Sequence, residues 1–76
     1  MNKQRRKMIS DVIERIEIAK NDLEMIRDEE QEAFDNLPDG LQGSERGEAM
    51  EDAIYQMEEA MDSMDEIIDN LYEVAE

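Results

Sequence analysis

The chain has 76 residues, of which 23 are acidic and 8 are basic, so its net charge at pH 7 is -15. It contains neither Cys nor His, which excludes a disulfide framework, a thiolate metal site and general-base catalysis by an imidazole. The negative charge disfavours direct contact with nucleic acid or a membrane surface and suits basic protein surfaces.

Helix-breaking residues lie only near the centre of the sequence, because all three Gly and the single Pro fall between residues 38 and 47. We therefore predict one all-α domain over residues 1–76, an antiparallel two-helix hairpin. The first helix is expected over about residues 3–36, the turn over about 37–44 and the second helix over about 45–75. No stretch approaches the ~20 apolar residues of a membrane-spanning helix, and the expected location is the cytoplasm.

Apolar residues of the first expected helix recur at alternating steps of three and four, which is a heptad pattern. The expected stripe consists of Ile9, Val12, Ile16, Ala19, Leu23, Ile26, Ala33 and Leu37. Ile13 and Phe34 widen this stripe on one side, whereas Ile18 and Met25 lie away from it. Glu30 fills one step of the stripe, so it should reach solvent near the turn or pair with a base such as Arg46.

The turn leads into the second helix through the segment Gly43-Ser-Glu-Arg-Gly47. Ser44 is the expected N-cap of that helix. Free backbone N–H groups at a helix start can bind anions, so Ser44, Arg46 and Gly47 form a candidate anion site. Acidic side chains at Glu45 and Glu48 already compensate the positive end of the helix dipole, which favours a purely structural turn.

The second expected helix has a stronger apolar pattern. Met50, Met57, Met64 and Leu71 recur every seven residues, with an apolar pair between successive members. Three apolar positions per heptad are more than one partner helix covers, so we predict self-association, with a dimer forming a four-helix bundle. The residues expected to mediate it are Ile18, Met25, Ile54, Met61 and Ile68.

Negative charge is concentrated on the second helix, since residues 51–76 contain 10 acids and no base. An antiparallel hairpin would place the basic residues Lys3, Arg5, Arg6 and Lys7 beside Asp69, Glu73 and Glu76. We expect the acidic surface to bind a basic protein, and an imitation of the DNA backbone is an alternative use of the same charge. The residues expected to contact the partner are Tyr55, Glu58, Asp62, Asp65 and Asp69.

Two sets of spaced carboxylates raise the possibility of metal-dependent catalysis. Glu14-x-x-Glu17 with Glu32-x-x-Asp35 resembles the metal-binding pattern of all-α nucleotide pyrophosphatases, which hold Mg²⁺ against a nucleoside triphosphate. The set Glu48-x-x-Glu51 with Glu66-x-x-Asp69 matches equally well, and both halves of each set fall on one helix, unlike that family. The pattern therefore follows from composition, and we expect no metal, no cofactor and no enzymatic activity.

The central segment, residues 28–48, combines Asp-Asn-Leu-Pro with Leu-Gln-Gly-Ser-Glu-Arg-Gly-Glu. This turn, with heptad helices rich in Glu, Ala, Met and Leu on both sides, resembles a group of short acidic proteins of bacteriophage and bacterial genomes. The resemblance covers most of the chain, and only the turn is distinctive. It implies a phage-associated helical hairpin and carries over no functional residue.

Three functional hypotheses follow. The first is a non-enzymatic protein that self-associates and binds a basic host or phage protein through an acidic helix face. The second is a module that binds a small anion at the turn or Mg²⁺ on paired carboxylates. The third is a Mg²⁺-dependent enzyme similar to the all-α nucleotide pyrophosphatases.

Overall fold

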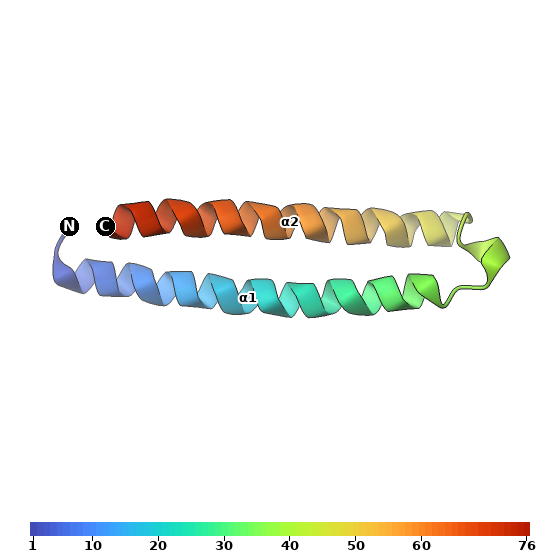
Figure 1. Cartoon of the computed structure of the whole chain (residues 1–76), viewed down its shortest axis with the longest axis horizontal. Coiled ribbons are helices and arrows are strands. Elements are labelled where there is room, and N and C mark those ends of the chain that lie inside the picture. Colours follow the sequence, from blue (N-terminus) through green and yellow to red (C-terminus); the bar gives the residue numbers. More distant parts are fainter.

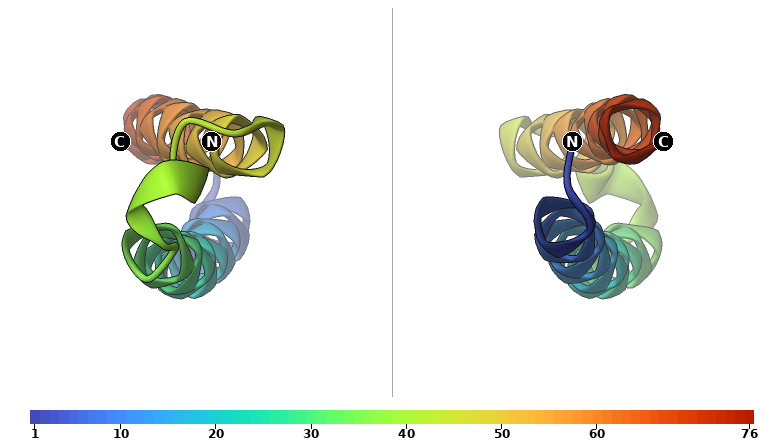
Figure 2. Two further views of the ribbon diagram at one scale, coloured as in Figure 1. Left: turned by 90° about the vertical axis from the view of Figure 1, so that its right-hand side faces the viewer. Right: turned by 90° about the vertical axis from the view of Figure 1, so that its left-hand side faces the viewer.

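The computed structural model describes all residues, 1–76, and consists of two long antiparallel helices joined by a short turn (Figure 1). Helix α1 spans Lys3–Asp35, the 3₁₀ helix η1 spans Asp39–Leu41, and α2 spans Glu45–Ala75. The Cα atoms extend over 59 × 15 × 12 Å. Seen along the long axis, the hairpin is a single layer of two helices (Figure 2). The predicted all-α hairpin is confirmed, and neither helix has an apolar stretch long enough to cross a lipid bilayer.

Both helices begin at a residue whose side chain caps the free backbone N–H groups of the first turn. The Asn2 side chain accepts a hydrogen bond from the backbone N–H of Arg5 at 2.8 Å. Ser44 caps α2 as predicted, because its hydroxyl oxygen accepts from the backbone N–H of Gly47 at 3.3 Å. The two caps fix where each helix starts and leave Pro38 and the 3₁₀ turn to reverse the chain between them.

The contact between the helices follows a regular heptad on each of them. On α2 the most buried residues are Gly47, Met50, Ile54, Met61 and Ile68, and on α1 the most buried residue is Ile13. Half-buried residues complete the contact, among them Ile9, Ile16, Lys20, Leu23, Arg27, Glu30, Phe34, Leu37, Met57, Met64, Leu71 and Ala75. We call this contact the seam.

The seam of α1 differs from the expected stripe along one edge. Val12, Ala19, Ile26 and Ala33 are exposed, and the positions that face α2 instead are Ile13, Lys20, Arg27 and Phe34. The central row of the α1 seam consists of Ile9, Ile16, Leu23 and Glu30, and Leu37 continues it beyond the end of the helix. The row on each side of it contains apolar residues, and a single partner helix covers only one of these two flanking rows. Acids of α2 lie beside Lys20 and Arg27 and pair with them, which is consistent with that edge facing α2.

Glu30 is half-buried on the seam near the turn and forms no ion pair, so the pairing with Arg46 that was considered for it is absent. Its partial exposure provides the solvation that an unpaired carboxylate needs. The expected pairing of the basic N-terminal segment with Asp69, Glu73 and Glu76 is also absent. The interhelical ion pairs lie instead near the middle of the hairpin, where two bases are part of the seam itself.

Candidate functional site

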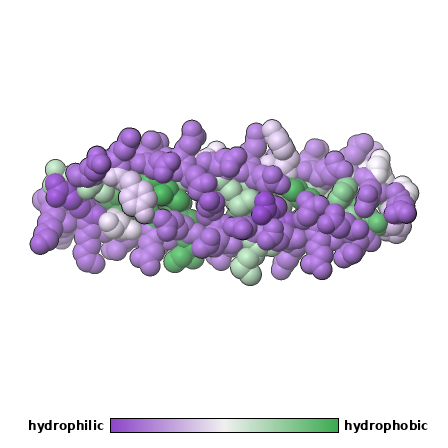
Figure 3. Space-filling model, viewed as in Figure 1, coloured by the Kyte–Doolittle hydropathy of each residue, from purple (hydrophilic) through white to green (hydrophobic).

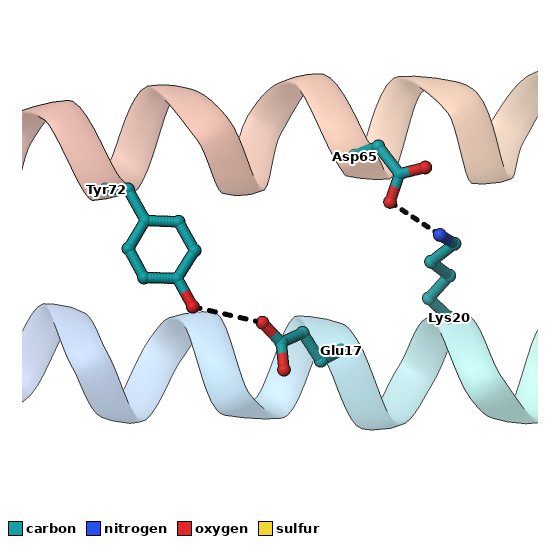
Figure 4. Close-up of polar contacts among 4 residues, drawn as sticks. All are labelled: Glu17, Lys20, Asp65 and Tyr72. Carbon is teal, nitrogen blue, oxygen red and sulfur yellow. Dashed lines mark hydrogen bonds and ion pairs between the residues drawn. The ribbon is translucent and has the colours of Figure 1, made fainter.

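One side of the hairpin carries every polar bridge between the two helices. Lys20 Nζ lies 2.6 Å from Asp65 Oδ1, and Arg27 Nη1 lies 3.9 Å from Glu58 Oε1. Farther toward the chain termini, the hydroxyl of Tyr72 donates to Glu17 at 3.4 Å (Figure 4). The hydrogen bond to Asp65 raises the pKa of Lys20 above its ordinary value. We call this side of the molecule the bridged side.

A shallow polar hollow of about 270 Å³ opens on the bridged side. Its floor is Met61, and its walls are Lys20, Glu24, Arg27, Glu58, Asp62 and Asp65. Lys20 and Arg27 pair with Asp65 and Glu58 across the hollow, whereas Glu24 and Asp62 form no ion pair and leave the hollow with a net negative charge. The face seen in Figure 3 is correspondingly hydrophilic over most of its area, with hydrophobic side chains visible mainly along the line between the helices.

The five residues expected to contact a basic partner all lie on α2 and all are exposed, but they divide into two groups. Glu58 and Asp65 border the seam and form the ion pairs with α1. Asp62 and Asp69 lie one row farther out and form no ion pair. Half of the expected acidic contacts are therefore partly compensated by α1, and the remaining charge lies on the outer row.

Tyr55 shares the outer row with Asp62 and Asp69, because the three positions are separated by seven residues. Its side chain is 62% exposed, and its hydroxyl donates to Glu59 at 2.9 Å. This hydrogen bond and the negative charge of Glu59 raise the pKa of the Tyr55 phenol. Tyr55 and the 55%-exposed Tyr72 give the bridged side two aromatic rings among its carboxylates.

The residues expected to mediate self-association are not brought together. Ile54, Met61 and Ile68 are buried in the seam, where α1 already covers them. Ile18 and Met25 are 53% and 65% exposed on the part of α1 that faces away from α2. Any surface that joins two hairpins must therefore include residues other than the buried three.

The candidate anion site at the turn is occupied by the chain's own groups. The Ser44 hydroxyl donates to the carbonyl oxygen of Leu41 and accepts from Gly47 N–H, so neither group is free for a ligand. Gly47 is buried, and a Cβ at this position would collide with the carbonyl oxygen of Gln42. Arg46 is exposed and forms no ion pair. The geometry gives these residues a structural role in closing the turn.

The spaced carboxylates of both helices are exposed, and no three acidic side chains are close enough to hold a metal ion. The two halves of each spaced set lie along one helix, so their separation is set by the helical rise of about 1.5 Å per residue. This arrangement gives the chain no preformed metal centre.

Sequence reasoning missed one surface, which lies on the side of the hairpin opposite the bridged side. We call it the uncharged face. On α2 it consists of two rows at intervals of seven residues: Ala53, Ala60, Ile67 and Val74, and Ala49, Gln56, Ser63 and Asn70. On α1 it consists of the row Val12, Ala19, Ile26 and Ala33. All of these residues except the half-buried Ala53 are exposed in the hairpin.

The signal for this face is present in the sequence as an absence of charge. Charged residues make up 41% of the chain, yet none occurs in these three rows between residues 12 and 33 or between residues 49 and 74. The acids of α2 all fall in the three remaining exposed rows.

Comparison of the chain with protein-family models, with curated proteins and with solved structures finds no match.

Proposed function

We propose that the chain is a non-enzymatic, cytoplasmic interaction protein that self-associates and binds a basic protein surface through the bridged side of α2. The observation that supports this most strongly is the segregation of charge around α2. Its acids occupy adjacent rows along the whole helix, and the opposite rows carry no charge between residues 49 and 74. Such a one-signed face attracts a basic partner from a distance and orients it before contact.

Aromatic side chains favour the bridged side over the rest of the acidic surface. It carries Tyr55 and Tyr72, whose rings combine apolar contact area with a polar tip, as side chains at interfaces often do. The back of α2, formed by the row Asp52, Glu59, Glu66 and Glu73, has neither an aromatic nor an aliphatic side chain. Charge alone can attract a partner there, but only the bridged side offers surface to bury against it.

The resemblance of the turn to short acidic phage proteins supports a partner from a host or phage. Small interaction proteins need no catalytic group, and this chain has no Cys or His to provide one. Anion binding at the turn has less support, because Ser44 and Gly47 hydrogen bond within the turn.

The test compares two variants that lose the same number of charges from different rows. The first combines Glu58→Gln, Asp62→Asn, Asp65→Asn and Asp69→Asn on the bridged side. The second combines Asp52→Asn, Glu59→Gln, Glu66→Gln and Glu73→Gln on the back of α2. Removing four acids changes the net charge from -15 to -11 in both, so non-specific attraction to a cation is matched.

Immobilised parent chain is used to capture basic proteins from a cell lysate at low salt, and each captured protein is then titrated with the parent and both variants. We expect the bridged-side variant to bind at least tenfold more weakly. Its affinity should also depend less on salt, because four of the charges that salt screens, with a Debye length of ~8 Å at physiological ionic strength, have been removed. The back variant should bind almost as tightly as the parent. Equal weakening of both variants would show that only net charge matters, and no weakening of either would show that the acids serve solubility.

A further inference from the structure

We propose that a second copy of this chain packs against the uncharged face along its whole length, with the twofold axis perpendicular to the long axis of the hairpin. The proposal rests on the self-association put forward above and names the surface and the symmetry that carry it. The result is a four-helix bundle in which the bridged side of each copy remains in contact with solvent.

The amount of exposed surface is the first argument. The hairpin has an accessible area of 5850 Å² and a mass of 8.9 kDa. Folded monomers of this mass expose about 4,800 Å², so the hairpin exposes about 1,000 Å² more than a compact monomer would. A standard interface covers about 800 Å² of each partner. Only 6 of the 76 residues are buried, and none has a completely buried side chain, so one long face is available for a second copy to cover.

The chemistry of the face is the second argument. Ile26, Ile67 and Val74 are each about half exposed, at 54%, 47% and 50%. The rows of the uncharged face run through three successive heptads of both helices without a charged residue. Because they lie on the same side of the hairpin, they form a continuous apolar and small-polar strip in an otherwise highly charged chain. A strip with the same heptad spacing as the seam is suited to another pair of helices.

The sizes of the side chains distinguish between the possible symmetries. The Lys20–Asp65 and Arg27–Glu58 pairs show which residues of the two helices are level: Val12 is level with Val74 near the termini, and Ala33 is level with Ala53 near the turn. A twofold axis along the hairpin would therefore stack four Val at one end and four Ala at the other. A perpendicular axis combines two larger residues with two Ala at every level, which keeps the spacing between the copies uniform.

The charges at the two ends agree with the perpendicular axis. Lys3, Arg5, Arg6 and Lys7 lie at the terminal end, and none of them forms an ion pair within the hairpin. Residues 28–35 at the turn end include five acids and no base. The perpendicular axis brings the four bases of each copy to the same end of the dimer as residues 28–35 of the other copy, whereas the parallel axis gathers the four bases of both copies at one end and both acidic turns at the other.

The first test compares two double substitutions by sedimentation equilibrium at tens of micromolar. Ile26→Glu with Ile67→Glu places two charges on the uncharged face, and Ile18→Glu with Met25→Glu places two charges on an exposed part of α1 outside it. We expect a dimer for the parent and for the control, and a monomer with the parent's helical circular dichroism for the face variant. A monomeric parent, a dimeric face variant or a monomeric control would each overturn the assignment of the face.

The second test determines the axis and uses the absence of native Cys. Chains carrying Val12→Cys are mixed with chains carrying Ala33→Cys and oxidised, and a second mixture combines Val12→Cys with Val74→Cys. The perpendicular axis brings positions 12 and 33 of different copies together, so a covalent dimer should form in the first mixture alone. Cross-linking in the second mixture alone, in both mixtures to the same extent, or in neither, would overturn the proposed axis.

Both tests are performed without any basic partner, so they are independent of the binding experiment. If the face variant is monomeric and the bridged-side acids prove unimportant, the dimer stands and the proposed partner binding fails. If the parent is monomeric and the bridged-side variant loses its partner, the reverse holds.

Discussion

Replacing Ile13 with Ala should destabilise the hairpin far more than the same replacement at Ile18. Both residues lie on α1, but Ile13 is 3% exposed and Ile18 is 53% exposed. The substitution removes three carbons, which at ~0.8 kcal/mol for each buried CH₂ is ~2.4 kcal/mol at Ile13. A residual cavity adds to this loss, and the higher helix propensity of Ala offsets a few tenths of a kcal/mol.

The expected net loss is therefore ~2–3 kcal/mol for Ile13→Ala and at most ~0.5 kcal/mol for Ile18→Ala. For a domain of this size 1 kcal/mol shifts the melting temperature by ~4–8 °C, so a difference of at least ~1.5 kcal/mol should separate the two melting temperatures by at least ~6 °C. Thermal unfolding is followed by circular dichroism at one fixed protein concentration, because the proposed dimerisation would make the melting temperature depend on concentration. Equal melting temperatures of the two variants would refute the assignment of Ile13 to the seam.

Two further predictions test local features. Gly47→Ala should lower the free energy of unfolding by ~1–3 kcal/mol, because the added Cβ would collide with the backbone of Gln42. Gly43→Ala adds a Cβ in open space and should be neutral or slightly stabilising. Urea titration of both variants measures the difference. In a Tyr72→Phe background the phenol of Tyr55 should titrate above its ordinary pKa, and adding Glu59→Gln should lower that pKa, as measured by ultraviolet absorbance of the phenolate. An unchanged titration curve after Glu59→Gln would show that Glu59 does not raise the pKa of Tyr55 in solution.

Much of the architecture could be predicted because the sequence marks it locally. Gly and Pro occur only between residues 38 and 47, and Ser44 lies where a capping side chain is needed. On α2 the buried rows contain no charge, so the side that faces α1 was identifiable from the apolar pattern alone. Met50, Ile54, Met61 and Ile68 are all buried there.

The register of α1 could not be predicted in the same way. The central row of α1 has Val12 and Ile26 on one edge and Ile13 and Phe34 on the other, and both edges are apolar enough to pack. The second of these edges also contains Lys20 and Arg27, which a pattern of apolar residues alone rejects. Lys20 pairs with Asp65 of α2, whereas Arg27 pairs with Asp28 on its own helix at 2.9 Å and with Glu58 of α2 at 3.9 Å. The pairs across the seam depend on distances between helices that sequence periodicity does not contain.

The candidate sites were predicted less well for a related reason. Counting apolar residues identified a wide stripe on α2 but assigned self-association to Ile54, Met61 and Ile68, which the hairpin itself buries. The more informative feature is the distribution of charge, since rows such as Gln56, Ser63 and Asn70 are polar but carry none. Such rows become apparent only when each of the seven helical positions is read separately.

Small-angle X-ray scattering tests the central claim, that two copies pack side by side along the uncharged face, because it measures mass and length together. The hairpin alone is 59 Å long. Full overlap of two copies should double the mass obtained from the forward scattering and leave the maximum dimension close to that of one hairpin. A monomer mass at all concentrations, or a doubled mass with a maximum dimension near twice the length of the hairpin, would contradict the account.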